Sequence, residues 1–325
     1  MRICVFGAGA VGGHVAAKLA AAGHDISVVA RGAHLEAMRA NGIVLLHGDQ
    51  TIRGRVRVEA DARALGPQDF VLVTLKANLL GAFADAAPRL ARDTSVVFVQ
   101  NGIPWWYGQG AGRALPDLSR LDPGGALAKG VAPGRILGGV AFSSNEVVEP
   151  GIVRNLVPGR NMLVVGEPDG KETSRVRQLR QALDAADMHS PPTGDIRQVI
   201  WSKLALNLGT SVLCTLAGET VGGVRGNPEV AAVADRLKAE GQAIAAAYGI
   251  STQDTPQRPG GGQSSGITAH KPSMLQDYER GRPMEIDSQV IVPLEFARAA
   301  GVTVPTLEAL APLLVLKARA KGLYA

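Results

Sequence analysis

The sequence predicts a two-domain α/β protein in which a doubly wound, mostly parallel sheet precedes an all-helical second half. Three observations support this. A glycine-rich turn, residues 7–12, directly follows the first apolar run. Short β-branched runs then alternate with amphipathic helical stretches, and from about residue 196 apolar residues recur at helical spacing. Since 325 residues exceed what one hydrophobic core usually organises, we predict domains at 1–195 and 196–325.

Six runs rich in Val, Ile and other strand formers are the predicted strands of the sheet. A Glu-Pro-Gly turn at 149–151 is expected to add an antiparallel hairpin. Four long segments with apolar residues at helical spacing are the predicted helices of the second half. The strands are expected at 2–6, 26–30, 70–75, 95–100, 136–142 and 162–167, and the helices at 200–216, 230–248, 284–300 and 306–321.

Two segments without a hydrophobic period are predicted to lie outside the core. Residues 109–134 are rich in Gly, Pro and Ala, which favours a surface excursion. Residues 257–266 include the run Pro-Gly-Gly-Gly-Gln-Ser-Ser-Gly, whose glycines and serines cannot build a packed element. We therefore expect a mobile loop there.

The composition narrows the function classes. The chain is 46% hydrophobic and 19% charged, as in ordinary soluble globular proteins. Its net charge of +5 comes from Lys and Arg scattered among acids, and aromatics are only 4%, which argues against nucleic-acid binding. No apolar run reaches the roughly 18 residues that span a bilayer, so no membrane segment is expected. Cys4 and Cys214 lie far apart in predicted core elements, which indicates buried thiols in the cytoplasm and no metal site.

The glycine-rich turn has the form of a dinucleotide-binding motif. Gly7, Gly9 and Gly12 make a GxGxxG pattern between a predicted strand and a predicted helix. The first glycine makes the turn, the second lets backbone N–H groups approach a pyrophosphate, and the third allows close packing of helix and strand. The phosphates are expected at the helix N-terminus, beside Ala10 and Val11. This predicts a Rossmann-type domain; a structural glycine turn and a signal peptide are the alternatives.

Arg31 follows the second predicted strand, where NAD-selective proteins usually place Asp or Glu. A carboxylate there accepts from the ribose 2′-hydroxyl and repels a 2′-phosphate, whereas a guanidinium binds the phosphate. The cofactor predicted from this position is NADPH/NADP. The alternative is a solvated surface arginine.

Polar residues occur where ligand-binding side chains are expected. Lys76 and Asn101 follow two predicted strands, at the carboxyl edge where ligands bind in open α/β sheets. Lys203 and Asn207 lie four residues apart on one face of an otherwise apolar helix. Reduction of a 2-oxo acid requires a hydride donor, an acid for the emerging alkoxide, and donors that hold the carboxylate. The sequence offers groups of these types, and its charge pattern favours a small anionic ligand such as a 2-oxo acid as the partner.

Six motifs follow one another along the chain: GxGxxG, Leu-Lys-Ala, Gln-Asn-Gly, Lys-Leu-Ala-x-Asn, Ser-Met-Leu-Gln-Asp and Glu-Ile-Asp. Together they resemble the ketopantoate reductase family over nearly the whole length, from residue 1 to about residue 305. The resemblance implies a Rossmann domain followed by a helical domain similar to that of 6-phosphogluconate dehydrogenase. It also implies an oxidoreductase that uses NADPH to reduce 2-dehydropantoate (ketopantoate) to pantoate in pantothenate biosynthesis.

The resemblance assigns roles to individual residues. Lys203 matches the family's general acid, which protonates the carbonyl oxygen as hydride arrives. Glu285 matches an acid that contacts the substrate and tunes that lysine. The remaining matches are Asn101 and Lys76 at the nicotinamide and substrate end, Ser273 as a donor to the substrate carboxylate, and Asn207 as a contact to the substrate hydroxyl.

Each role has a structural alternative. Lys76 and Asn101 can be strand-end caps, and Glu285 can be half of a structural ion pair. Ser273 can be the N-cap of its helix. The joint occurrence of six matches in order favours the functional interpretation over these alternatives.

Ser211 departs from the family pattern, because the family has a second asparagine four residues beyond Asn207. At this substrate-binding position a serine presents one hydroxyl, whereas an asparagine amide presents both a donor and an acceptor group. Reduction of another 2-oxo acid is therefore one alternative, and a non-catalytic NADPH sensor is another. Oxidative decarboxylation of a β-hydroxy acid agrees less well with the motifs. The apolar residues of 306–316 are compatible with closing the core or with a homodimer.

Overall fold

The computed structural model describes residues 1–253 and 269–325, so the predicted loop at 257–266 lies outside the described residues. The described residues divide into two units, each with its own core. The first comprises residues 1–100 and 124–196. The second comprises residues 101–123 and the described residues after 196. The segment 101–123, which carries Asn101, thus clusters with the second unit although the predicted first domain contains it.

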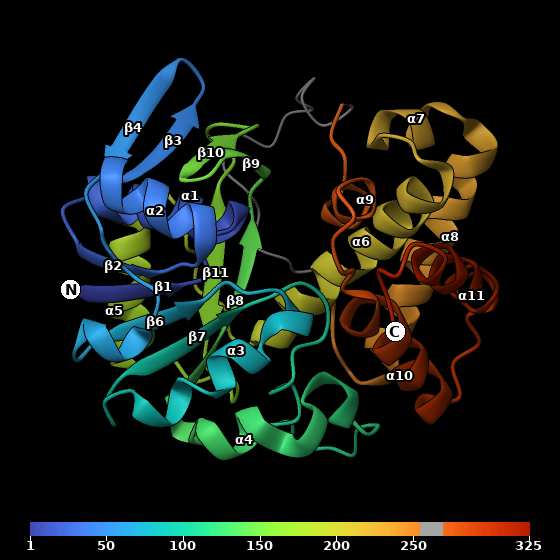
Figure 1. Ribbon diagram of the computed structural model, residues 1–325. Coiled ribbons are helices and arrows are strands. Elements are labelled where there is room, and N and C mark those ends of the chain that lie inside the picture. The colour runs from blue at the N-terminus through green and yellow to red at the C-terminus, as the bar shows by residue number, and fades with distance from the viewer. Residues whose placement is uncertain (254–268) are drawn as a thin grey trace. The chain divides into compact units, whose positions relative to one another are not determined.

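A seven-stranded sheet organises the first unit, in the order β11-β8-β7-β6-β1-β2-β5 (Figure 1). Neighbouring strands are parallel except for β11, which runs antiparallel to β8. This order places the crossover from one half of the sheet to the other between β1 and β6. The strands are β1 (Arg2–Phe6), β2 (Asp25–Val29), β5 (Arg57–Glu59), β6 (Phe70–Val73), β7 (Ser95–Val99), β8 (Ile136–Phe142) and β11 (Met162–Gly166).

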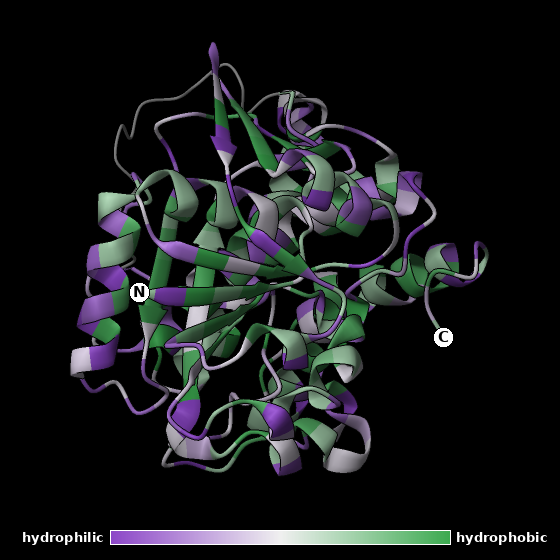
Figure 2. Cartoon of the chain, turned by 60° about the vertical axis from the view of Figure 1, so that its left-hand side comes forward, coloured by the Kyte–Doolittle hydropathy of each residue, from purple (hydrophilic) through white to green (hydrophobic). Residues whose placement is uncertain are grey.

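The central strands are buried on both faces. Every residue of β6, β7 and β8 is buried, as expected of parallel strands covered by helices on both sides, and every residue of the antiparallel edge strand β11 is buried as well. Figure 2 shows strands of this sheet as largely hydrophobic segments. All six strands predicted from the sequence are confirmed, with bounds shifted by at most two residues. Their β-branched runs are long and uninterrupted, so their positions could be read directly.

A second, four-stranded sheet, in the order β4-β3-β10-β9, was not predicted apart from its β9-β10 hairpin. It packs against α1, and a Cβ at Gly13 would lie 2.6 Å from the side chain of Val153. Four of the five residues of β4 are not buried, so this strand has no continuous apolar run that a sequence pattern can detect. The strands are β3 (Ile43–His47), β4 (Gln50–Gly54), β9 (Asn145–Glu149) and β10 (Ile152–Asn155).

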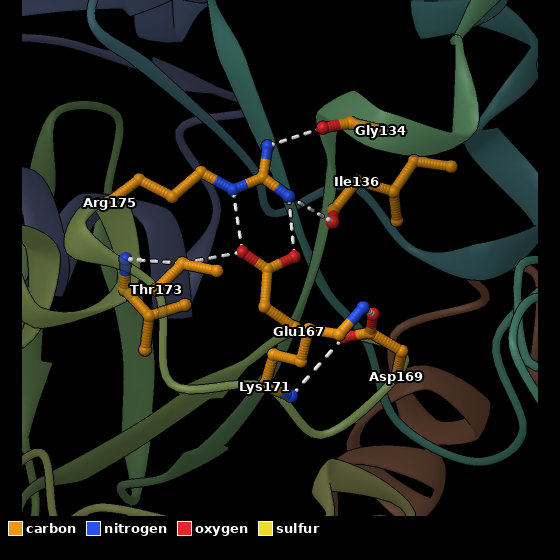
Figure 3. A network of polar contacts seen from close by, with 8 residues as sticks. Gly134, Ile136, Glu167, Asp169, Lys171, Thr173 and Arg175 are labelled. Carbon is orange, nitrogen blue, oxygen red and sulfur yellow. Dashed lines mark hydrogen bonds and ion pairs between the residues drawn. The ribbon is translucent and has the colours of Figure 1, made fainter.

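Five helices accompany these sheets, and α5 is fixed by a partly buried ion pair. Arg175 contacts both carboxylate oxygens of Glu167, which follows β11, and donates to the carbonyl oxygens of Gly134 and Ile136 at the start of β8 (Figure 3). One arginine therefore satisfies groups from two strands and a connecting turn. The helices are α1 (Ala10–Ala21), α2 (Gly32–Asn41), α3 (Gly81–Ala84), α4 (Ala126–Gly130) and α5 (Ser174–Ala185).

The second unit is helical in its described part, as predicted. The helix α6 alone is long and apolar enough to cross a membrane among the described residues. However, 72% of its most apolar window is buried inside the protein, as in the core helix of a soluble domain. The helices are α6 (Ile196–Ala217), α7 (Val221–Gly226), α8 (Pro228–Ala247), α9 (Ser273–Glu279), α10 (Val292–Ala300) and α11 (Pro305–Arg319).

The helix predicted at 284–300 begins later than expected and is irregular. Met284 and Glu285 precede it outside regular secondary structure, and residues 287–291 form a π-helical turn before α10. Proline explains where the π-helical turn ends. In a π-helix the carbonyl of residue i bonds the N–H of residue i+5, and for Ser288 that partner is Pro293, which has no N–H. The Ser288 carbonyl therefore accepts from the backbone N–H of Ile103 instead, at 2.8 Å.

Two smaller predictions can also be compared with the structure. Cys4 and Cys214 are both buried free thiols, as expected. The surface excursion predicted for 109–134 holds for its first part only. Residues 126–130 form α4, and Leu121 and Leu127 are buried, because these isolated leucines supply an apolar side without a detectable period.

Candidate active site

The GxGxxG loop has the geometry that each glycine requires. Gly7 has a φ of +110°, a conformation that side chains rarely allow. A Cβ at Gly12 would lie 2.0 Å from the carbonyl oxygen of Gly7, so only glycine lets α1 approach β1 this closely. Gly9 is different, because no heavy atom lies within 4 Å of its Cβ position. The backbone at Gly9 is thus open to a ligand.

The start of α1 has the chemical features of an anion-binding site. No side chain caps the helix at Gly9, and no acidic residue occupies its first turn. The N–H groups at the beginning of a helix carry a partial positive charge and lack intrahelical partners. The predicted residues Ala10 and Val11 form this first turn. A pyrophosphate would satisfy the exposed N–H groups, so the loop is suited to a dinucleotide.

The loop after β6 lies beside the glycine loop at the switch point of the sheet. Thr74 donates from its hydroxyl to the carbonyl oxygen of Gly7 at 2.6 Å. Lys76 comes two residues later, is partly exposed, and begins the short 3₁₀ turn Ala77–Leu79. In doubly wound sheets this position borders the ligand crevice. The structure therefore brings Lys76 and the glycine loop to the same edge of the sheet, as predicted.

Arg31 lies exposed at the end of β2, immediately before α2. Within the described residues it has no ion-pair partner. Arg39, in contrast, donates to the carbonyl oxygen of Val58 and to the carboxylate of Glu59. Arg57 also bonds Glu59, so the one carboxylate beside the end of β2 already has two cationic partners. The side chain available to a 2′-phosphate is that of Arg31.

The helix α6 presents three predicted residues at a spacing of four. Lys203 and Asn207 are partly exposed, whereas Ser211 is buried at 4% exposure. The positions between them, such as Leu204, Ala205 and Leu208, are buried in the core of the unit. The partly exposed face of α6 thus carries an amine and an amide, one helical turn apart.

The π-helical turn brings other predicted residues together. Glu285 is buried at 7% exposure and lies two residues before the turn. Gly102, which follows Asn101, has a φ of +76°, and its Cβ would lie 2.3 Å from the Ser288 carbonyl oxygen. The Asn101 loop is therefore packed on the turn that follows Glu285. Asn207 joins the same place, because its amide nitrogen donates to Gln289 at 3.4 Å.

Ser273 is the first residue of α9 and is exposed. The N-cap of that helix is Pro272, and no side chain caps it. The alternative interpretation of Ser273 as a side-chain N-cap is therefore wrong. Its role as a donor to the substrate carboxylate stays a prediction.

A buried arginine that the sequence analysis missed holds the Asn101 segment on α6. Arg197 is 7% exposed and donates to the carbonyl oxygens of Tyr107 and Gln109. The indole of Trp201 donates to the Tyr107 hydroxyl at 2.7 Å. These contacts position the segment that begins at Asn101 relative to the helix that carries Lys203. An arginine in the first turn of an apolar helix was the available signal.

Comparisons with known proteins cover both units of the chain. The family model described as "Ketopantoate reductase PanE/ApbA" matches residues 3–170, and that described as "Ketopantoate reductase PanE/ApbA C terminal" matches residues 195–318. The chain belongs to the ketopantoate reductase family. A 2-dehydropantoate 2-reductase of Mesorhizobium japonicum is 41% identical, and the alignment covers 100% of both chains.

Solved structures of ketopantoate reductases have the same fold. A putative ketopantoate reductase from Ralstonia solanacearum is 35% identical, with a TM-score of 0.86 over 99% of both chains. A structure described as dimeric ketopantoate reductase from Staphylococcus aureus has a TM-score of 0.70 at 18% identity, covering 99% of this chain and 100% of that one. The predicted fold class and family are thereby confirmed. The roles of individual residues stay predictions.

Proposed function

We propose that the protein is an NADPH-dependent reductase that converts ketopantoate to pantoate in pantothenate biosynthesis. The observation that carries this proposal is the full-length similarity to a 2-dehydropantoate 2-reductase at 41% identity. Each unit contributes observations that support it. The first unit has an open glycine loop and an exposed Arg31, and the second carries an amine and an amide on one face of α6 and a buried carboxylate at Glu285.

Lys203 is the proposed general acid. When bound, NADPH supplies the hydride that reduces the carbonyl carbon. The carbonyl oxygen gains negative charge in that step, and an ammonium group can neutralise it by giving up a proton. Glu285 is the proposed carboxylate that keeps the lysine protonated until the substrate is in place.

The other predicted residues position the substrate. Asn101 and Asn207 present amides near the turn that follows Glu285, and Ser273 is the proposed donor to the substrate carboxylate. Ser211, which the family pattern would make an asparagine, is the proposed hydroxyl contact, direct or through water. In the first unit, Lys76 is the proposed contact at the nicotinamide end.

The decisive experiment is initial-rate NADPH oxidation by the purified protein with ketopantoate, 2-oxoisovalerate and a bulkier 2-oxo acid at equal concentrations. A clear preference for ketopantoate supports the proposal. Preference for another acid would assign the protein to a paralogous activity. Tight NADPH binding without oxidation in any of these mixtures would indicate the sensor function instead.

We further propose that the protein is a homodimer in the cytoplasm. The exposed residues Leu313 and Leu316 of α11 offer an apolar surface, and the Staphylococcus aureus relative is described as dimeric. The buried free thiols Cys4 and Cys214 agree with a reducing compartment. Light scattering coupled to size-exclusion chromatography tests the dimer, and Leu313→Ser with Leu316→Ser should shift it to monomer. Cell fractionation tests the location.

A further inference from the structure

Gln289 is a buried amide that neither the sequence motifs nor the proposed mechanism uses. It is the third residue of the π-helical turn and is 2% exposed, between Ser288 and Val290, which are buried as well. Burying an amide side chain costs free energy unless it is hydrogen-bonded. The hydrogen-bond partner of Gln289 therefore indicates what this side chain does.

Two contacts place Gln289 between α6 and the loop that carries Asn101. Its side-chain oxygen accepts from the amide nitrogen of Asn207 on α6 at 3.4 Å. Its Cγ would lie 2.9 Å from a Cβ at Gly102, which follows Asn101. Gln289 therefore touches the helix that carries Lys203 and the loop that carries Asn101, and it lies four residues after Glu285.

The hydrogen bond sets the orientation of Asn207. An asparagine amide has a donor edge and an acceptor edge, and the two edges point in different directions. Because the donor edge faces the Gln289 oxygen, the carbonyl oxygen of Asn207 faces away from Gln289. Asn207 is partly exposed on the same face of α6 as Lys203, so an acceptor is presented one turn from the proposed acid.

A hydrogen-bond acceptor held in one orientation, such as the carbonyl oxygen of Asn207, favours substrates that carry a donor group. A site built to hydrogen-bond a hydroxyl rejects the analogue without it more strongly than an apolar pocket discriminates by size. We propose that Gln289 is a specificity-determining residue that, by fixing the Asn207 amide, makes the enzyme prefer a 2-oxo acid with a hydroxyl group over the same acid without one. This inference rests on the proposed reductase function.

The test compares two substrates that differ only by that hydroxyl: ketopantoate and 3,3-dimethyl-2-oxobutanoate. The wild-type protein should favour ketopantoate in kcat/KM by on the order of 100-fold. Gln289→Met keeps the volume and removes the acceptor, and should reduce the ratio about 10-fold, because one oriented hydrogen bond is lost. The loss should appear in the KM for ketopantoate, with little change for the deoxy acid.

Two further variants separate orientation from packing. Gln289→Glu retains an accepting oxygen and should keep most of the preference. Gln68→Met removes another buried amide, one that bonds the carbonyl oxygen of Leu65 in the first unit, and should leave the ratio unchanged. If Gln289→Met does not fold, Gln289→Leu provides a second variant without the acceptor, and the Gln289→Glu ratio is measured in either case.

The outcomes are distinguishable. A selective loss on ketopantoate in the Met or Leu variant, with retention in the Glu variant, supports the inference. Equal losses on both acids, no change in the ratio, or a wild-type protein that does not distinguish the two acids overturns it. A wild-type protein that oxidises NADPH with neither acid overturns the proposed function itself.

Discussion

The hydroxyl group of Thr74 donates to the carbonyl oxygen of Gly7 at 2.6 Å, and this bond joins the loops that follow β6 and β1. The same hydroxyl lies 2.3 Å from the position that a Cβ at Gly12 would take. The Thr74 hydroxyl, the Gly7 carbonyl and Gly12 are therefore tightly packed against one another. The second glycine, Gly9, lies outside it with open space above its Cα.

This contrast predicts opposite effects for two glycine substitutions. Gly12→Ala should destabilise the fold by about 2 kcal/mol or more, because its Cβ would overlap backbone and hydroxyl atoms. Gly9→Ala should leave the melting temperature nearly unchanged but weaken NADPH binding at least tenfold, because its methyl group would occupy the space above the exposed N–H groups. Thermal denaturation and fluorescence titration check both. Equal melting temperatures for the two variants would contradict the packing argument.

Arg31→Ala should raise the KM for NADPH about 10- to 100-fold and leave the KM for NADH nearly unchanged, because only NADPH carries the 2′-phosphate. Arg39→Ala is the matched control. Its guanidinium is bound to Val58 and Glu59, so its loss should affect stability more than cofactor choice. Initial rates at varied NADPH and NADH concentrations give the two KM values for each variant. Equal losses for NADPH and NADH would reject Arg31 as the residue that reads the phosphate.

Lys203→Ala should lower kcat by about two to four orders of magnitude, because the alkoxide would form without a proton donor. NADPH binding should persist, since the glycine loop and Arg31 belong to the other unit. Lys171→Ala is the control, because Lys171 forms a surface ion pair with Asp169. Stopped-flow kinetics under single-turnover conditions isolates the chemical step. Retained single-turnover rates would assign the acid to another group.

His14 predicts a loss of stability in mild acid. Burial in α1, together with the nearby positive charge of Lys18 and the ring of His47, lowers the pKa of His14 to about 3; Asp187 opposes this shift. In the unfolded chain its pKa is close to 6.5. Between these values the unfolded state binds more protons, so stability falls as pH drops below about 6.5, by at most about 1.4 kcal/mol per pH unit.

His14→Leu should flatten that dependence, because neither ring nitrogen has a hydrogen-bond partner among the described residues and no polar contact is lost. Melting temperatures at pH 7.0, 6.0 and 5.0 provide the measurement. His189→Leu is the control, since its ring is 41% exposed. The same pH slope in the wild type and in His14→Leu would show that other groups govern acid stability.

Much of the fold was readable because its signals are local. The glycine loop, the six buried strands and the apolar helices each occupy one continuous run, so the sequence pattern was sufficient. The second sheet was missed except for its hairpin, because β4 is mostly exposed. The late start of the helix after Glu285 was missed for another reason. Apolar spacing continues through Glu285 and the π-helical turn, so apolar periodicity does not report where the regular helix begins.

The site was predictable where function requires a specific residue type at a specific spacing. Lys203 and Asn207 are recognisable because a charged and an amide side chain interrupt an apolar helix. Gln289 and Arg197 act through partners 82 and 90 residues away in the chain, so their roles emerge only when the chain is folded.

The π-helical turn at 287–291 also fixes an angle. One extra residue in a helical turn rotates the chain that precedes the turn by about 100° about the helix axis, compared with a regular α-helix. Ile286 leads into this turn and α10 follows it, so the direction in which the chain runs back to Glu285 is offset relative to α10 by that rotation. Point substitutions around Glu285 alter the groups near its carboxylate but leave the direction of its side chain unchanged. Deleting one residue from the turn would instead rotate the carboxylate by more than a quarter of a circle, with its sequence neighbours unchanged.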